Sequence, residues 1–154
     1  MIDNNTTSPA VSQRQNAKEY LSQAFLLGKQ IDSKFEQLSS LRDLATKATA
    51  VINAMPRSTS PDAHRSQNVI AKIVDLENEV SGDLNELVDL KSNITHLIKS
   101  LQNRDYQTLL ELRYLCFKPW EQVADSMGYS LHHLYKLHNA ALDACGRLMQ
   151  DDTS

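Results

Sequence analysis

The sequence WEQVADSMGYSLHHLYKL, from Trp120 to Leu137, places small, apolar and turn-forming residues at the spacing of two short helices joined by a tight turn. Ala124 is small enough for two helices to approach closely. Gly128 follows four residues later, where a helix end requires a positive φ that only glycine adopts without a Cβ penalty. Ser130 can then cap the next helix by accepting a bond from a first-turn N–H. This spacing predicts a helix-turn-helix.

The second predicted helix has an apolar side and a polar side. Leu134, Leu137 and Ala141 define the apolar side, and a turn of 100° per residue then directs His132, Lys136 and Asn139 away from it. His138 lies nearer the buried side and is expected at the edge of the core. Asparagine can bond adenine, lysine can meet guanine or phosphate, and leucine can touch a thymine methyl. The candidate DNA-binding residues are Lys118, Ser130, Leu131, His132, His133, Tyr135, Lys136 and Asn139.

The flanking residues extend this pattern. LLELRYLCFKPWEQVADSMGYSLHHLYKLHNAAL, from Leu109 to Leu142, resembles region 4 of bacterial sigma factors, in which a short helix with an L-R-Y/F-type motif precedes the helix-turn-helix. The order of elements from Ala17 to about Leu142 is similar to a family of small uncharacterised phage proteins from Gram-positive hosts. The resemblance implies a sigma-like DNA-binding domain with a role in phage transcription. It also implies contact with RNA polymerase, which region 4 makes through its apolar surface.

Two features depart from region 4. Lys118-Pro119 replaces the Ser or Thr that usually caps the first helix of the motif, although proline suits a helix start. The reading helix carries histidines where sigma factors place arginines. From Asp105 onward the chain has four basic and seven acidic residues, and three histidines that can offset this charge below about pH 6.5. A single copy is therefore expected to bind DNA weakly and to need a second copy or another partner.

The middle of the chain carries heptad repeats that predict assembly. The expected oligomerisation residues are Ile73, Leu76, Val80, Leu87, Leu90, Ile94, Leu97 and Leu101, and only Asp83 interrupts their spacing. An earlier seam runs through Ala17, Leu21, Ala24, Gly28, Ile31, Phe35 and Leu38, then shifts to Leu41, Leu44, Ala48, Val51 and Met55. Pro56 is expected to end the first helix, with Ser60 and Pro61 starting the second. We expect a homo-oligomer, with a dimer favoured.

The predicted fold is all-α: a long antiparallel helical hairpin (coiled coil) followed by a C-terminal helix-turn-helix domain. The expected divisions are a flexible N-terminus at 1–12, the hairpin at 13–103, the sigma-region-4-like domain at 104–149 and a flexible tail at 150–154. Cys116 and Cys145 are expected to be reduced core thiols.

Several classes of function lack support in the sequence. It has no Gly-rich phosphate loop, CxxC or HExxH motif, or local pairing of a nucleophile with a base, so no enzyme, cofactor or small-molecule substrate is expected. His138 and Cys145 share a helix face, but two ligands do not make a zinc site. No apolar run is long enough for a membrane span and no signal peptide is apparent, so a cytoplasmic protein is expected, in the host cell if it is phage-encoded.

The leading interpretation is a sequence-specific transcriptional regulator. One alternative is a small terminase-like DNA-packaging factor, which also combines a helix-turn-helix with helical oligomerisation. Another is a coiled-coil interaction protein that has lost DNA binding and acts on a protein partner such as RNA polymerase. The chain's formal net charge of −3 favours the last of these.

Overall fold

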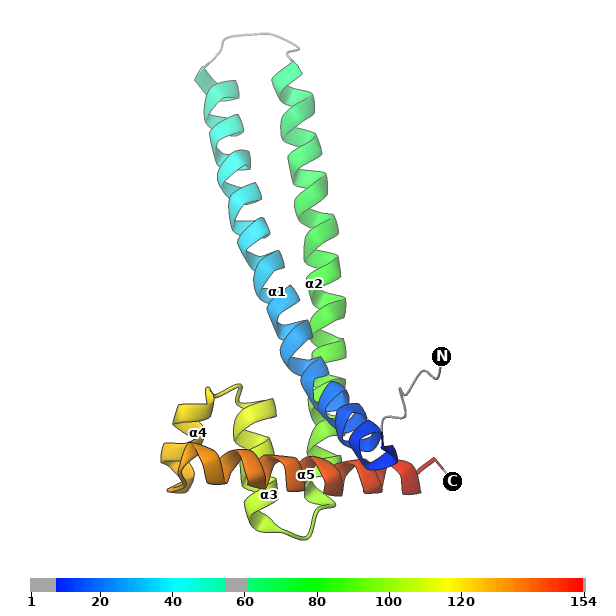
Figure 1. Cartoon of the computed structure of the whole chain (residues 1–154). Coiled ribbons are helices and arrows are strands. Elements are labelled where there is room, and N and C mark those ends of the chain that lie inside the picture. The colour runs from blue at the N-terminus through cyan, green and yellow to red at the C-terminus, as the bar shows by residue number, and fades with distance from the viewer. Residues whose placement is uncertain (1–7, 55–60, 154) are drawn as a thin grey trace, which may run out of the picture. The chain divides into compact units, whose positions relative to one another are not determined.

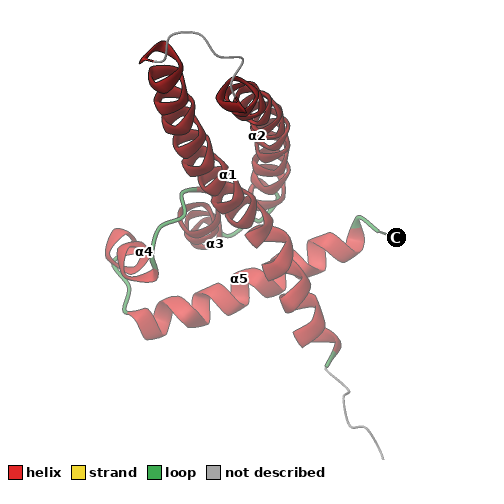
Figure 2. Cartoon of the chain, turned by 90° about the horizontal axis from the view of Figure 1, so that it is seen from above, coloured by secondary structure: helices red, strands yellow, loops and turns green. Residues whose placement is uncertain are grey.

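The computed structural model describes residues 8–54 and 61–153, and all regular secondary structure within these ranges is helical, with no strand (Figure 2). The predicted all-α class is therefore confirmed. The predicted turn residues Pro56 and Ser60 lie outside the described residues. The elements in Figure 1 are α1 (Pro9–Ala54), α2 (Pro61–Lys99), α3 (Arg104–Leu110), the π-helical segment η1 (Glu111–Leu115), α4 (Trp120–Met127) and α5 (Leu131–Asp151).

The chain divides into two compact units, and both long helices contribute to each of them. One unit comprises Met1–Leu26 with Val88–Ser154, and the other comprises Leu27–Leu87. The predicted boundary between 103 and 104 differs from this division, because the start of α1 and the end of α2 belong with the C-terminal helices. Residues 9–12 and 150–151, which were predicted to belong to the flexible ends, form part of α1 and α5.

Within the Leu27–Leu87 unit, α1 and α2 contact each other through ion pairs. Lys34 Nζ donates to the Asp83 carboxylate and lies 3.5 Å from Glu79, and Arg42 Nη2 lies 3.0 Å from Glu77. Asp83, which interrupts the heptad pattern, therefore has a basic partner on α1. The long side chains of lysine and arginine can pack along apolar surface while their charges pair.

Three residues of the predicted seam of α1 lie outside its least exposed side. Phe35, Leu44 and Val51 are 48%, 53% and 45% exposed, whereas Leu27, Ile31 and Leu38 are buried. Lys34 and Ala45 occupy the half-buried positions instead. The predicted shift of register near Leu41 was wrong, because counting only apolar residues overlooked a lysine that is paired with Asp83.

The predicted oligomerisation residues of α2 lie on the least exposed side of that helix. Val80, Ile94 and Leu101 are buried within a single chain. The other five, which are Ile73, Leu76, Leu87, Leu90 and Leu97, are half-buried. These residues are therefore partly or fully covered within a single chain.

The unit of Met1–Leu26 and Val88–Ser154 has a core to which all the α-helices contribute. Its fully buried side chains include Leu21, Ile94, Ile98, Leu109, Leu110, Val123, Leu134, Leu142 and Cys145. The start of α1 is tied to α5 by Arg14, whose Nε and Nη2 donate to the two Asp143 carboxylate oxygens at 2.7 and 2.8 Å. Gln13 Nε2 also donates to Gln150 Oε1 at 2.7 Å. These contacts hold the start of α1 against α5.

Gly146 marks a close approach between α5 and α1. A Cβ added at Gly146 would lie 2.8 Å from the Gln13 carbonyl oxygen, which is too short for any side chain. Cys145 beside it is buried, as predicted, and burial raises the pKa of its thiol to about 12. The expectation for Cys116 was wrong, because this cysteine directly follows η1 and is exposed.

Candidate nucleic-acid interface

The turn between α4 and α5 has the local geometry that its sequence predicts. Gly128 adopts φ 72° and ψ 29°, and its N–H bonds back to the carbonyls of α4. Ser130 is the N-cap of α5, and its hydroxyl accepts a bond from the His133 N–H at 3.2 Å. Val123 and Ala124 are buried on α4, opposite Leu134 on α5. The left-handed glycine and the serine cap together set the direction in which α5 leaves the turn.

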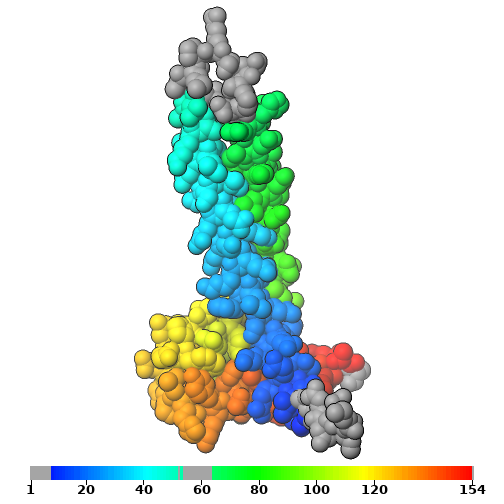
Figure 3. Space-filling view, turned by 45° about the horizontal axis from the view of Figure 1, so that its top comes forward, coloured from blue at the N-terminus to red at the C-terminus, as the bar shows by residue number. Residues whose placement is uncertain are grey.

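The beginning of α5 presents one polar face to solvent. Of the predicted contact residues, seven are exposed, namely Ser130, Leu131, His132, His133, Tyr135, Lys136 and Asn139. Lys118, which precedes α4, is half-buried. The surface of α4 and of these first turns of α5 is coloured yellow to orange in Figure 3. The structure thus brings most of the predicted residues together on one helix face, with only Lys118 outside it.

The opposite side of α5 is held by an aromatic cluster around His138. His138 Nε2 and the Tyr114 hydroxyl form a hydrogen bond of 2.7 Å, and the Trp120 ring lies 4.6 Å from the His138 ring between centroids. Burial lowers the pKa of His138 to about 4, with Lys18, Arg113 and Arg14 acting in the same direction. His138 is therefore neutral at physiological pH and cannot supply the positive charge that the sequence analysis assigned to three histidines.

Tyr114 itself belongs to the segment that resembles the L-R-Y motif. Leu112, Arg113, Tyr114 and Leu115 all lie in η1, where the helix widens to a π-helical turn. The Arg113 guanidinium lies 4.6 Å from the Trp120 ring centroid, and its Nη1 donates to the Lys118 carbonyl at 3.0 Å. These contacts fix the segment that leads into α4. The sequence pattern identified these residues but gave no signal for the π-helical turn.

Phe117 and Pro119 complete the entry to α4. Phe117 has a positive φ of 58°, which is unusual for a residue other than glycine. Its ring packs on Phe25 with centroids 5.5 Å apart, and Lys91 Nζ lies 4.8 Å from the ring centroid. Pro119 precedes the first residue of α4 and provides no side-chain cap, in agreement with the predicted loss of a cap hydroxyl.

The charge around the polar face is less acidic than the sequence count indicates. Asp143 continues the line of His132, Lys136 and Asn139 along α5, and the bidentate contact with Arg14 neutralises it. The hydrogen bond from Arg14 lowers the pKa of Asp143, so the carboxylate stays ionised and the pair is retained. Glu121 and Asp125 on α4 remain exposed. Lys136 is the only Lys or Arg among the exposed contact candidates, so the face is weakly basic.

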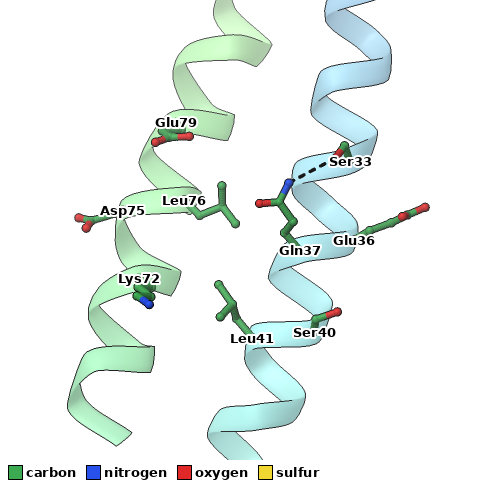
Figure 4. A pocket seen from close by; sticks show the side chains of 9 residues that line it. All are labelled: Ser33, Glu36, Gln37, Ser40, Leu41, Lys72, Asp75, Leu76 and Glu79. Carbon is green, nitrogen blue, oxygen red and sulfur yellow. Dashed lines mark hydrogen bonds between the residues drawn. The ribbon is translucent and has the colours of Figure 1, made fainter. Parts of the chain in front are cut away.

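The described residues also include a groove on the long helices. A groove of about 690 Å³ lies between α1 and α2, with Leu41 and Leu76 directed toward each other and polar or charged side chains around them (Figure 4). Within residues 8–54 and 61–153, no cluster of three or more His, Cys, Asp or Glu side chains could hold a metal ion. None of the described helices has the length and apolar character needed to cross a membrane.

These features define a helical protein with one exposed polar helix face beside a tight turn. The chain belongs to the protein family of unknown function DUF1492, whose model matches residues 58–145 and thus more than half of the chain. The matched residues include the turn between α4 and α5, the start of α5 and the L-R-Y segment. No curated protein and no solved structure matches the chain significantly.

Proposed function

We propose that this protein is a sequence-specific DNA-binding regulator of transcription, encoded by a phage. In this proposal α4, the Gly128 turn and α5 form a sigma-region-4-like helix-turn-helix, and α1 and α2 form an antiparallel coiled-coil hairpin. The observation that carries the proposal is the exposed polar face of α5, which directly follows a left-handed glycine and a serine cap while the opposite side is buried.

The chemistry of this face fits the major groove of DNA. His132, Lys136 and Asn139 share the outward side of α5, and an α-helix fits into the major groove, where amide and ammonium groups can reach base edges. Leu131 and Tyr135 are exposed beside them and can contact thymine methyl groups or sugars. The first turn of α5 also offers N–H groups to a phosphate.

The charge of the face argues for more than one copy on the DNA. Phosphate contacts from Lys and Arg supply most non-specific affinity, and this face has few of them. Two linked copies convert the second contact into an intramolecular step, which raises affinity without any new contact. We therefore propose a homodimer in the cytoplasm of the host, with RNA polymerase as a further partner.

The double variant Lys136→Ala, Asn139→Ala tests the site. We expect the wild-type chain to retain one fragment from a digest of its own genome against competitor DNA. The double variant should lose at least about tenfold in affinity, because each base contact contributes roughly 1–3 kcal/mol. Gel-shift titration at low and moderate salt measures both. Lys99→Ala, which removes an exposed charge from α2, is the control and should bind like the wild type. Equal binding by the double variant would contradict the assignment of this face.

The second candidate is an interaction protein that keeps the fold and acts on a protein partner. The exposed Glu121 and Asp125 on α4 favour it, because they would lie near a phosphate backbone. Under this alternative the double variant leaves the biological effect of the protein intact, and no fragment is retained even at low salt. A terminase-like packaging factor differs from both in assembling large rings, which sedimentation would detect.

A further inference from the structure

One side of α2 is apolar and exposed, and it lies next to the side that contacts α1. Ile70, Val74, Leu84 and Val88 are 52%, 49%, 41% and 67% exposed. Their spacing of four, ten and four residues places them within about 80° of the helix circumference. The least exposed line, through Ile73, Val80 and Leu87, is centred about 80° away. An exposed apolar stripe of this kind on a folded chain marks an interaction surface.

The neighbouring residues add almost no charge to this stripe. Glu77 and Ser81 lie between the two apolar pairs, and Glu77 is paired with Arg42 of α1. The exposed positions beside the stripe, on the side away from α1, are uncharged: Ala71, Asn78 and Asn85. The opposite side of the helix carries the charged residues Lys72, Glu79 and Glu86. Apart from Glu77, whose charge is paired with Arg42, the stripe is therefore an uncharged strip on α2.

Phe35 of α1 extends the apolar surface. It precedes Arg42 by seven residues and so lies on the same side of α1, and the contact between Arg42 and Glu77 shows that this side borders the stripe. Phe35 is 48% exposed. Phe35 was expected in the seam, but it is exposed. It therefore adds an apolar side chain of α1 beside the stripe on α2.

The spacing of the apolar residues along the stripe is the same in both directions. Ile70 and Val74 are followed by Glu77 and Ser81 and then by Leu84 and Val88, so the pattern is symmetric about position 79. A second α2 running antiparallel would place Ile70 opposite Val88, Val74 opposite Leu84, and Glu77 opposite Ser81. Each Glu77 would thus meet a hydroxyl rather than another carboxylate. A self-complementary patch of this kind is what a two-fold symmetric contact requires.

We propose that the stripe of Ile70, Val74, Leu84 and Val88 is the surface on which a second copy of this chain docks, with the two α2 helices antiparallel about a two-fold axis near Glu79. This surface deepens the proposed function, because it supplies the second copy that a weakly charged reading face needs. The heptad residues that the sequence assigned to assembly are less exposed than this stripe.

Sedimentation equilibrium of the full chain without DNA tests the surface. We expect the wild type to be a dimer, and the double variant Val74→Glu, Leu84→Glu to dissociate with a Kd at least about a hundredfold higher, because four carboxylates would be buried without partners. Leu44→Glu is the control, since Leu44 is 53% exposed on α1 and lies outside the stripe. Circular dichroism checks that each variant remains helical. A wild type that is monomeric at all concentrations, or a helical double variant that still forms a dimer, would overturn the proposal.

Cross-linking provides a second test that does not depend on destabilising variants. In a Cys116→Ser background, Ser81→Cys should be joined to its mate by a short bismaleimide, because position 81 lies two residues from the proposed axis. Glu79→Cys points to the other side of α2 and should not be joined. Equal cross-linking at both positions would contradict the geometry. Neither test uses DNA, so a dimer that binds no DNA would overturn the proposed function alone, and a DNA-binding monomer would overturn this surface alone.

Discussion

For His138, the sequence predicted the side of α5 on which the residue lies but not the residues that it contacts. A turn of 100° per residue correctly placed it toward the buried side of α5, because helical geometry is local. Its partners Tyr114 and Trp120 come from η1 and α4. No periodicity identifies such a pair, because the contact depends on how separate segments pack.

The buried neutral His138 predicts a loss of stability on acidification. Its pKa is lowered to about 4 in the folded chain from 6.5, so the unfolded chain binds the extra proton first as pH falls. The stability should therefore decrease below about pH 6.5, with the loss complete below about pH 4, and the total is roughly 3 kcal/mol. Urea unfolding at a series of pH values measures it.

The variant His138→Gln isolates this effect, because glutamine can bond the Tyr114 hydroxyl but does not titrate in this range. Its stability at pH 7 should be lower than that of the wild type, and its decrease between pH 6.5 and 4 should be smaller. An equal decrease in both proteins would show that other groups cause the acid sensitivity.

At the scale of elements, the sequence predicted the helices better than their contacts. The ends of α4 and α5 follow from Gly128 and Ser130, whose chemistry acts within one turn. The heptads found the least exposed side of α2 and most of that of α1. They placed Phe35 in the seam, where Lys34 lies instead because it pairs with Asp83. The π-helical turn of η1 and the left-handed Phe117 had no sequence signal, because both depend on packing against residues distant in the chain.

The crossing of α1 and α5 at Gly146 gives a prediction at this scale. Gly146→Ala should lower the free energy of unfolding by about 1–3 kcal/mol, because its Cβ meets the Gln13 backbone and one of the two helices must move. Gly82→Ala in α2 is the matched control, since a Cβ there meets nothing within 4 Å and alanine favours a helix by up to about 1 kcal/mol. Urea denaturation of both variants tests this, and a neutral Gly146→Ala would contradict the close crossing.

At the scale of the whole molecule, the chain divides into two units, and each long helix contributes to both of them. The predicted boundary after residue 103 separated the heptad repeat from the sigma-like segment, whereas Arg14 on α1 reaches Asp143 on α5 and joins the start of the chain to its end. That contact also neutralises an acidic residue on the line of the polar face. Most of the candidate contact residues could be chosen from the sequence because they lie on one helix. Nothing in the sequence identified Arg14 as the partner of Asp143, because the two residues are far apart in the chain.

The proposed regulator has two interaction surfaces with different functions. The stripe on α2 would hold two copies together, and α5 of each copy would meet DNA. Because the reading face is weakly charged, binding by such a dimer should depend less steeply on salt than binding by a strongly basic protein.

Methylation protection on the fragment that the full chain retains tests the central claim most directly. Dimethyl sulfate modifies guanine N7 in the major groove, where α5 would lie. We predict that the wild type protects guanines in one or two short major-groove segments, and that Lys136→Ala, Asn139→Ala removes this protection while Lys99→Ala does not. Retention of no fragment even at low salt, or protection unchanged by the double variant, would contradict the assignment of α5 as the helix that reads DNA.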